Sequence, residues 1–242
     1  MKLERLIAGY FTSPAGIFRA GDAMDETVRY PVPVYVIETP SERILLDTGL
    51  NPAAIADPAA YYERPDVFAF SALEQEQSVA EQLDVSTLTK VVLTHLHWDH
   101  VGGLSLIPAS VPLVIQRAEW LAGGDAEAVQ RNFFLTRDYA EDERELVLVD
   151  GDLDLLGDGS VELLSTPGHT PGHQSVRVGQ TVIGADVSHF ASGLDDHRFP
   201  VFADDHEQQA RSAERLRALR DAGLDVIPGH DPEILRAGAV TA

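Results

Sequence analysis

Short apolar runs separated by turn residues recur along the chain and predict a protein rich in strands. The runs at 32–38 and 43–47 are separated by Pro40-Ser41, which predicts a β-hairpin. The uniformly apolar Val91-Val92-Leu93 is typical of a strand that is buried on both faces. Further short strands are expected over 113–115, 162–164, 181–184 and 224–227.

Helical periodicity is clearest over 206–222. Asp205 is placed to cap this helix together with Gln208, and Gly223 follows its last turn. Apolar residues within 72–83 also fall on one helical face, so a second helix is expected there. Strands and helices are therefore mixed along the chain, which indicates the α/β class.

Two of the expected strands end in an aspartate, at Asp47 and at Asp186. This weak internal echo suits a sandwich of two sheets. No long linker or low-complexity tract interrupts the sequence, so residues 1–242 are expected to form a single domain.

The net charge of the chain limits the kinds of partner that it can bind. Of the 242 residues, 44% are apolar, which is enough for one sizeable core. Asp and Glu number 39 against 18 Lys and Arg, so the formal charge is −21. A surface this acidic repels phosphate backbones and anionic lipids, so neither nucleic acid nor a membrane is an expected partner. The acidic residues within 137–158 are interpreted as a solvated rim rather than as a cation site.

The sequence contains no cysteine. This excludes disulfides, iron–sulfur clusters, thiolate zinc sites and cysteine nucleophiles. The first residues, MKLERLIAGYF, include Glu4 and no long apolar run, which is not the pattern of a secretory signal. No stretch approaches the roughly 18 apolar residues of a membrane helix. We therefore expect a cytoplasmic protein.

The segment 94–103, THLHWDHVGG, carries four potential metal ligands directly after the expected buried strand. Side chains two residues apart on an extended segment point the same way, so His95 and His97 can bind one ion. Asp99 and His100 lie where the chain turns and can face a second ion beside the first. Each of these histidines alone would be interpreted as structural, but the cluster indicates a metal site.

Further ligands must be histidine or carboxylate, because cysteine is absent. His169 and His173 lie in the Pro/Gly-rich loop 166–173, Asp186 ends a strand, and His230 follows the last strand. Sites in open α/β layers gather at strand ends. Imidazole together with carboxylate suits zinc and related divalent ions.

These motifs, HLHWDH (95–100), PGHTPGH (167–173), GAD (184–186) and PGHD (228–231), resemble those of the metallo-β-lactamase superfamily and follow the same order. The resemblance implies an αββα sandwich with two divalent ions at one edge of the sheets; zinc is expected, and Mn, Fe and Co are alternatives. It also implies the metal ligands, namely His95, His97 and His169 for the first ion, Asp99, His100 and His230 for the second, and Asp186 bridging both. Asp47 would orient a ligand, whereas His173 would support its loop.

Within the superfamily, the pattern is most similar to the N-acyl-homoserine lactonases, which open a lactone ring and thereby quench quorum sensing. Branches with a cysteine ligand are excluded, an RNA-processing enzyme fits poorly with the negative charge, and the flavo-diiron branch prefers glutamate in place of His97. In such a lactonase a hydroxide bridging the ions would attack the lactone carbonyl, and Asp99 would accept and then deliver the proton.

His189 is a departure from the lactonase pattern, which has a tyrosine three residues after the bridging aspartate. An imidazole can donate the same hydrogen bond to the lactone oxygen, so His189 is a second candidate catalytic residue. The acyl tail of such a substrate also needs an apolar groove. Phe68 and Phe70 are the first candidates for it, and Trp98 is interpreted as packing. The other candidates are Met24, Tyr30, Phe133, Phe134, Phe199 and Phe202.

Two other functions compete with the lactonase. Another hydrolase on the same scaffold, such as a phosphotriesterase or a glyoxalase II-like thioesterase, would use the same ions on a different ester. A non-catalytic metal or ligand binder is the rival from a different class, although pure binding has no need of an open pair of ions. The oligomeric state is not specified by the sequence, with which a homodimer is compatible.

Overall fold

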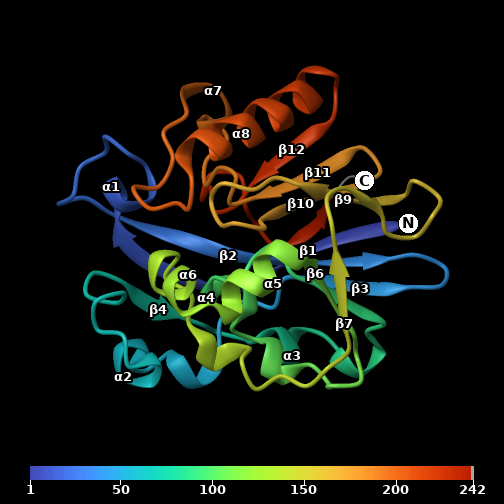
Figure 1. The fold of residues 1–242 in the computed structure, drawn as a ribbon, viewed down its shortest axis with the longest axis horizontal. Helices are drawn as coiled ribbons and strands as arrows, with labels where there is room; N and C mark the ends of the chain where they lie inside the picture. The colour runs from blue at the N-terminus through green and yellow to red at the C-terminus, as the bar shows by residue number, and fades with distance from the viewer. Residues whose placement is uncertain (241–242) are drawn as a thin grey trace.

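The structure is a computed structural model that describes residues 1–240. It consists of two β-sheets stacked face to face, with helices on both outer sides (Figure 1). The strands of the first sheet are β1 (Lys2–Pro14), β2 (Thr27–Glu38), β3 (Arg43–Leu46), β4 (Ala72–Glu74), β5 (Lys90–Val92), β6 (Leu113–Gln116), β7 (Leu146–Val149) and β13 (Gly238–Val240). The strands of the second sheet are β8 (Leu153–Asp154), β9 (Val161–Ser165), β10 (Gln174–Val178), β11 (Thr181–Ala185) and β12 (Asp225–Pro228).

The helices form the two outer layers of this αββα sandwich. In Figure 1, α7 and α8 lie beyond the second sheet, and α2 to α6 lie on the opposite side of the molecule. The helices are α1 (Ala15–Phe18), α2 (Pro58–Tyr62), α3 (Val79–Gln82), α4 (Trp98–Val101), α5 (Arg117–Gly124), α6 (Ala126–Arg131), α7 (Gly193–Asp196) and α8 (His206–Asp221). Single 3₁₀ turns occur at Pro52–Ala54, Val85–Thr87, Leu104–Leu106 and Thr136–Asp138. Within residues 1–240, no helix is long and apolar enough to cross a membrane.

The order of the strands brings several strand ends to one place. The first sheet runs β13-β1-β2-β3-β5-β6-β7, with β4 also paired to β1, and the second runs β12-β11-β10-β9-β8. β3, β5, β6 and β7 are parallel neighbours, and so are β11 and β12. Parallel neighbours end at the same edge of a sheet, so the segments that follow β3 and β5 begin side by side, as do those after β11 and β12.

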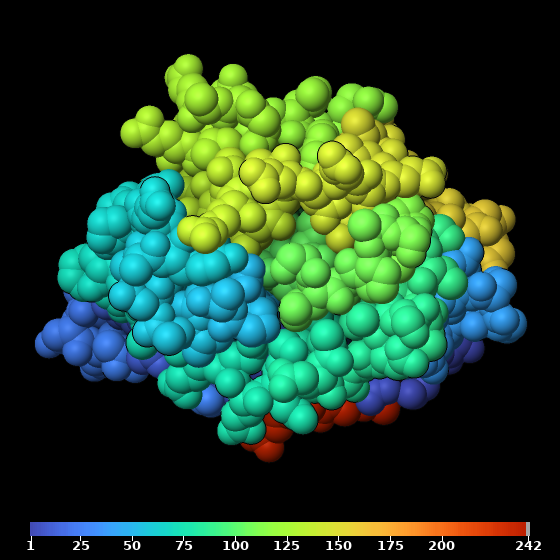
Figure 2. Space-filling view, turned by 90° about the horizontal axis from the view of Figure 1, so that it is seen from below, coloured from blue at the N-terminus to red at the C-terminus, as the bar shows by residue number. Residues whose placement is uncertain are grey.

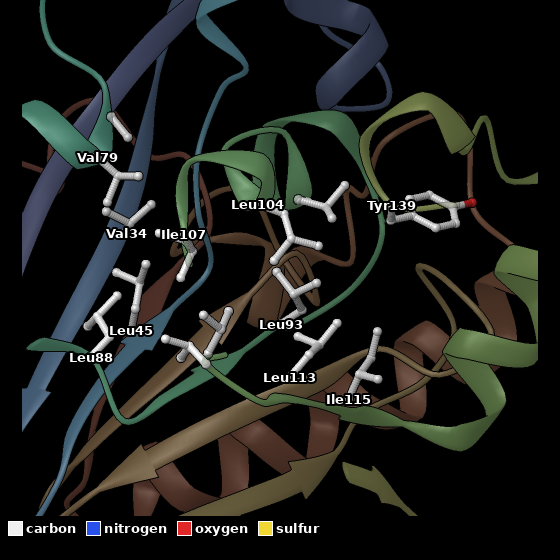
Figure 3. Packing of buried hydrophobic residues seen from close by; sticks show 14 of the residues in the cluster. Val34, Leu45, Val79, Leu88, Leu93, Leu104, Ile107, Leu113, Ile115 and Tyr139 are labelled. Carbon is white, nitrogen blue, oxygen red and sulfur yellow. The ribbon is translucent and has the colours of Figure 1, made fainter. Parts of the chain in front are cut away.

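Alternating apolar residues give each central strand of the first sheet two buried faces. Ile44 and Leu46 of β3 pack in the core between the sheets, whereas Leu45 packs in the core beneath the helices. Val91 and Val92 of β5 divide in the same way. Figure 3 shows the cluster beneath the helices, where side chains of strands and helices face into one space. The uniformly apolar runs in the sequence therefore correspond to strands covered on both sides.

Most of the expected elements are confirmed. The hairpin at Pro40-Ser41 joins β2 to β3, each predicted strand is present, and Asp205 caps α8 by accepting a hydrogen bond from the Gln208 N–H. The two aspartate-ending strands, β3 and β11, lie in opposite sheets.

The helix expected over 72–83 is wrong. Its first residues form β4, where Leu73 lies opposite Phe11 of β1, and only Val79–Gln82 is helical. Pairing with the long first strand, which the sequence patterns did not predict, outweighs the local helical periodicity.

The glycine pair after α4 lets this helix dock closely on the segment that follows β3. The Thr48 N–H donates to the His100 carbonyl over 2.7 Å, and the Gly103 N–H donates to the Gly49 carbonyl over 3.0 Å. A Cβ atom at Gly103 would overlap the Thr48 carbonyl oxygen, and one at Gly102 would overlap the Gly49 carbonyl oxygen and the Asn51 nitrogen. Close backbone approach therefore requires glycine at both positions.

We expect the substitution Gly103→Ala to lower the free energy of unfolding by about 1–3 kcal/mol, since its new methyl group must push α4 away from Thr48. Gly124→Ala at the exposed end of α5 is the matched control, because nothing lies within 4 Å of a Cβ there. The control should be neutral or stabilising by up to about 1 kcal/mol. Urea unfolding of the two variants measures both effects, and equal stabilities would contradict the close-approach argument.

Candidate metal centre

The seven predicted metal ligands come together at the edge where the strands of the two sheets end. His95 and His97 follow β5, Asp99 and His100 lie in α4, and the others follow β9, β11 and β12. Two groups form around Asp186, and each member offers a ligand atom within 4.8 Å of the others in its group. The first ligand group is His95, His97 and His169, together with Asp186, and the second ligand group is Asp99, His100 and His230.

The Asp186 carboxylate lies between the two groups, and its oxygens approach histidine nitrogens of both. Its Oδ2 is 3.4 Å from His169 Nε2 and 3.8 Å from His95 Nε2, in the first ligand group. In the second ligand group, Oδ1 is 3.2 Å from His230 Nε2, and Oδ2 is 3.6 Å from His100 Nε2. This orientation is that of a carboxylate able to share two cations.

Imidazole nitrogens converge within the first ligand group. His97 Nδ1 is 3.0 Å from His95 Nε2 and 3.0 Å from His169 Nε2. Three ring nitrogens of buried histidines therefore surround one point beside the Asp186 carboxylate. This is the donor set that zinc and similar divalent ions prefer.

Partners behind three of the histidines fix which ring nitrogen faces the centre. The Asp47 Oδ2 atom is 2.8 Å from His100 Nδ1, and the Pro31 carbonyl oxygen is 2.8 Å from His230 Nδ1. His97 is turned the other way, because its Nε2 lies 2.8 Å from the Asn132 carbonyl oxygen. A ring N–H held by such an acceptor leaves the opposite nitrogen free to bind an ion.

The orienting role predicted for Asp47 agrees with this geometry. Its Oδ1 also accepts a hydrogen bond from the Thr94 N–H over 2.8 Å, and the Thr94 hydroxyl lies 2.9 Å from its Oδ2. The same carboxylate thus holds the start of the ligand motif and the His100 ring. Asp47 has a positive φ of 58°, an uncommon backbone conformation for which aspartate is enriched.

Several buried atoms at the centre lack a protein partner, which suits a bound cation. Within residues 1–240, His100 Nε2, His230 Nε2 and Asp186 Oδ1 have no hydrogen bond. Leaving buried polar atoms unpaired is costly, and an ion between them would satisfy all three. The donors therefore fit divalent metal binding.

The two ligand groups differ in their protonation. Burial lowers the pKa of His95 and His169 well below the usual value, so both imidazoles are neutral. Burial also opposes the charging of His100 and His230, but Asp186 and Asp99 outweigh it and raise the pKa of both. Burial alone would raise the pKa of Asp186 too, yet the surrounding imidazoles hold it well below its usual range.

His173 lies outside both ligand groups and supports them. Its Nε2 accepts a hydrogen bond from the Asp186 N–H over 3.1 Å, and its Nδ1 lies 3.0 Å from the Thr166 hydroxyl. Burial lowers the pKa of His173 to about 3, so the ring is neutral, as an acceptor must be. It links the loop after β9 to the end of β11.

Glu119 is a residue of the site that sequence reasoning missed. It is fully buried in α5 and accepts hydrogen bonds from the Leu96 N–H over 3.0 Å and the Gly172 N–H over 2.8 Å. Burial raises the pKa of this carboxyl to about 7. Glu119 thereby joins the two histidine-bearing loops, but a single glutamate in a short helix gives no signal of this in the sequence.

A cavity of about 330 Å³ opens onto the candidate metal centre, where His97, Asp99, Asp186 and His189 lie at its base. Its apolar walls come from five separate parts of the chain. These wall residues are Ile17, Phe18, Val67, Phe70, Trp98, Phe133, Val201 and Phe202.

Three of the predicted groove residues, Phe70, Phe133 and Phe202, line this cavity. Phe68 does not line it but packs behind Trp98, with their ring centroids 5.4 Å apart. Trp98, interpreted as packing, does pack against Phe68 and also lines the cavity. Tyr30, Phe134 and Phe199 are buried elsewhere, and Met24 is exposed outside the cavity.

The interpretation of 137–158 as a solvated rim is wrong for Asp138. Its buried carboxylate accepts hydrogen bonds from Asn51 Nδ2 over 2.9 Å and the Tyr62 hydroxyl over 2.7 Å. Burial raises its pKa to about 6. The bond from Tyr62 ties α2, which precedes the wall residues Val67 and Phe70, to the chain beyond Phe133. Figure 2 shows these two parts of the chain, in cyan and yellow-green, side by side on one face.

Relatives named as N-acyl homoserine lactonases are similar in sequence to this chain over most of its length. It is 27% identical over 225 residues to the N-acyl homoserine lactonase AttM of Azorhizobium caulinodans, an alignment that covers 84% of this chain and 82% of the relative. It is 28% identical over 221 residues to an N-acyl homoserine lactonase of Bacillus cereus, with 84% and 82% covered.

Solved structures share the fold over nearly the whole chain. An N-acyl homoserine lactone hydrolase with N-hexanoyl-L-homoserine bound at its catalytic metal centre superposes with a TM-score of 0.84, at 24% identity, over 96% of this chain and 94% of that one. A mutant of AiiA from B. thuringiensis with N-decanoyl-L-homoserine at its active site gives a TM-score of 0.84 at 25% identity, with the same coverage.

The family model described as Metallo-beta-lactamase superfamily matches residues 27–230, a range that contains both ligand groups and Asp186. The matched range, the αββα sandwich and the motifs that carry the histidines lead to the same conclusion: the chain belongs to the metallo-β-lactamase superfamily.

Proposed function

We propose that this protein is a metal-dependent hydrolase that opens the lactone ring of N-acyl-homoserine lactones and thereby quenches quorum sensing. The observation that carries the proposal is the position of Asp186, between two groups of buried ligands at the base of an apolar cavity. The named relatives, which are N-acyl homoserine lactonases, support the same substrate class.

The ligand assignment of this proposal gives each ligand group one divalent ion, with Asp186 shared by both. Zinc is the metal we propose, because histidine and carboxylate donors without cysteine suit it. Divalent ions so held supply Lewis acidity, which polarises a carbonyl group and acidifies water. The remaining tasks, proton transfer and binding of the substrate, are carried out by the side chains around the ions.

Asp99 is the residue that we propose moves the proton. Its Oδ2 is 3.3 Å from His230 Nε2 and 3.7 Å from His100 Nε2, so the carboxylate belongs to the second ligand group. Asp99 also lines the cavity, where a substrate ester would lie. A carboxylate in this position can take a proton from water as the carbonyl is attacked and pass it to the leaving alkoxide oxygen.

The cavity suits the acyl tail of such a substrate. Phe70 and Val201 line it and remain 69% and 60% exposed, which leaves an apolar mouth open to solvent. The tail of an acyl-homoserine lactone is uncharged and apolar, so it would bury these side chains with a gain of roughly 25 cal/mol for each Å² removed from water. The acidic surface would not repel this neutral substrate.

We expect Asp99→Asn to lower the rate of lactone opening by about 10²–10⁴-fold, since an amide cannot carry the proton. Acid release in a pH-stat with a long-chain acyl-homoserine lactone measures this rate. Asp150→Asn is the control, because Asp150 is exposed and pairs with Arg117 far from the histidine motifs along the chain. It should retain the wild-type rate.

An Asp99→Asn variant as fast as wild type would contradict the proton-transfer role. Wild-type protein that hydrolyses a phosphotriester or a thioester, but no lactone, would instead support another hydrolase of the same scaffold. Hydrolysis of none of the three by metal-loaded protein would favour a non-catalytic binder.

Lowering the pH should remove one ion before the other. In the metal-free protein, carboxylates raise the pKa of His100 and His230, whereas burial lowers the pKa of His95 and His169. Protons therefore compete for the second ligand group at a higher pH than for the first, and the ion of the second group should leave first as the pH falls.

Metal analysis after dialysis at stepwise lower pH measures this release. Two separate losses are expected for wild type. A His230→Gln variant should hold one ion and lose it at the lower of the two pH values. Simultaneous loss of both ions from wild type would contradict the assigned difference between the groups.

A further inference from the structure

The imidazole of His189 lies among the ligand atoms, on the cavity side of Asp186. Its Nε2 is 3.2 Å from Asp186 Oδ2, closer than His169 Nε2 at 3.4 Å or His95 Nε2 at 3.8 Å. Ligand atoms of Asp186, His189 and His230 lie within 4.8 Å of one another, the same spacing that joins each of the two ligand groups. By geometry, His189 is equivalent to the histidines already assigned as ligands.

His189 and His230 flank the Asp186 carboxylate. Their rings are stacked, with centroids 5.0 Å apart and planes inclined by 25°. His230 Nε2 faces Oδ1 of Asp186, and His189 Nε2 faces Oδ2. Both rings therefore direct the same nitrogen toward the space that the carboxylate oxygens share.

The surroundings of His189 hold it less firmly than those of His97, His100 and His230. The side chain is only 2% exposed, and Phe18 packs edge-on against it with ring centroids 5.3 Å apart. Within residues 1–240, its Nδ1 has no hydrogen-bond partner. His100 and His230 have Asp47 and the Pro31 carbonyl oxygen behind them, and such acceptors strengthen and orient a ligand.

We propose that His189 is an additional, exchangeable metal ligand, which binds through Nε2 beside Asp186 and yields its place when a substrate enters the cavity. This inference rests on the proposed function, since it requires the ions of the two ligand groups. Its basis is a ring nitrogen at ligand distance from the shared carboxylate, on a ring without the acceptor that stands behind His97, His100 and His230. A hydrogen bond from His189 to the substrate carbonyl is the alternative that the experiment separates from it.

The test compares cobalt(II)-loaded wild-type protein with His189→Gln. Glutamine keeps an amide N–H donor at about the reach of Nε2, but an amide is a poor ligand compared with imidazole. In the NMR spectrum, each ligating imidazole N–H is shifted by the paramagnetic ion. We expect one fewer shifted N–H resonance in His189→Gln, together with about tenfold or more weaker binding of one ion in competition with a chelator.

His206→Ala is the matched control, because His206 is an exposed histidine at the start of α8. It should keep every shifted resonance and the wild-type affinities. Circular dichroism checks that His189→Gln is folded, and His189→Tyr provides a second variant that also lacks the imidazole.

The outcomes are distinct. Loss of one resonance with weaker binding in both His189 variants supports the ligand. An unchanged spectrum and unchanged affinities, with slower lactone opening, would overturn it and assign His189 to hydrogen bonding with the substrate. Failure of wild-type protein to bind two ions would overturn the proposed function itself, and the inference with it.

Discussion

A carboxylate buried among imidazoles is the constraint on which the arrangement of this molecule depends. Asp186 is 2% exposed, and nitrogens of five histidines lie within 3.2–3.8 Å of its oxygens. Burying an ionised carboxylate is costly unless charges compensate it. The surrounding imidazoles provide part of this compensation, and they hold the pKa of Asp186 well below its usual range. Divalent ions would complete this compensation, because they would also satisfy the nitrogens that lack protein partners.

The two-sheet scaffold brings these groups together from distant parts of the sequence. Asp47 follows β3, the histidine motif follows β5, Asp186 follows β11 and His230 follows β12. Parallel pairing within each sheet brings neighbouring strand ends together. Glu119 then connects a loop of the first sheet to one of the second, and His173 connects two loops of the second sheet. The positions of the ligands are therefore set by buried hydrogen bonds rather than by the loops alone.

The ligand cluster was the part of the structure most open to prediction from sequence. Histidines at fixed spacing after an apolar run, with glycines beside them, encode both the chemistry and the local backbone that presents it. The strands of the core were also predictable, because their alternation follows from burial on two faces. Gly102 and Gly103 were also informative in the sequence, because only glycine permits the close approach of α4 to the segment after β3.

Other features depend on partners that local patterns do not contain. The helix expected over 72–83 failed because Leu73 pairs with Phe11, which is remote in sequence. Phe68 and Phe70 looked equivalent, yet one packs inward on Trp98 and the other lines the cavity. The Asn132 carbonyl that orients His97 is a backbone group, so no residue type marks it. Asp138 looked like one more residue of an acidic rim, but distant Asn51 and Tyr62 bury and bind it.

Anomalous X-ray diffraction from crystals grown with zinc tests the central claim most directly. The account predicts two anomalous peaks at the zinc edge, one within the first ligand group and one within the second, with the Asp186 carboxylate between them. A single peak, or peaks away from these histidines, would contradict the shared role of Asp186 on which the proposed lactonase depends.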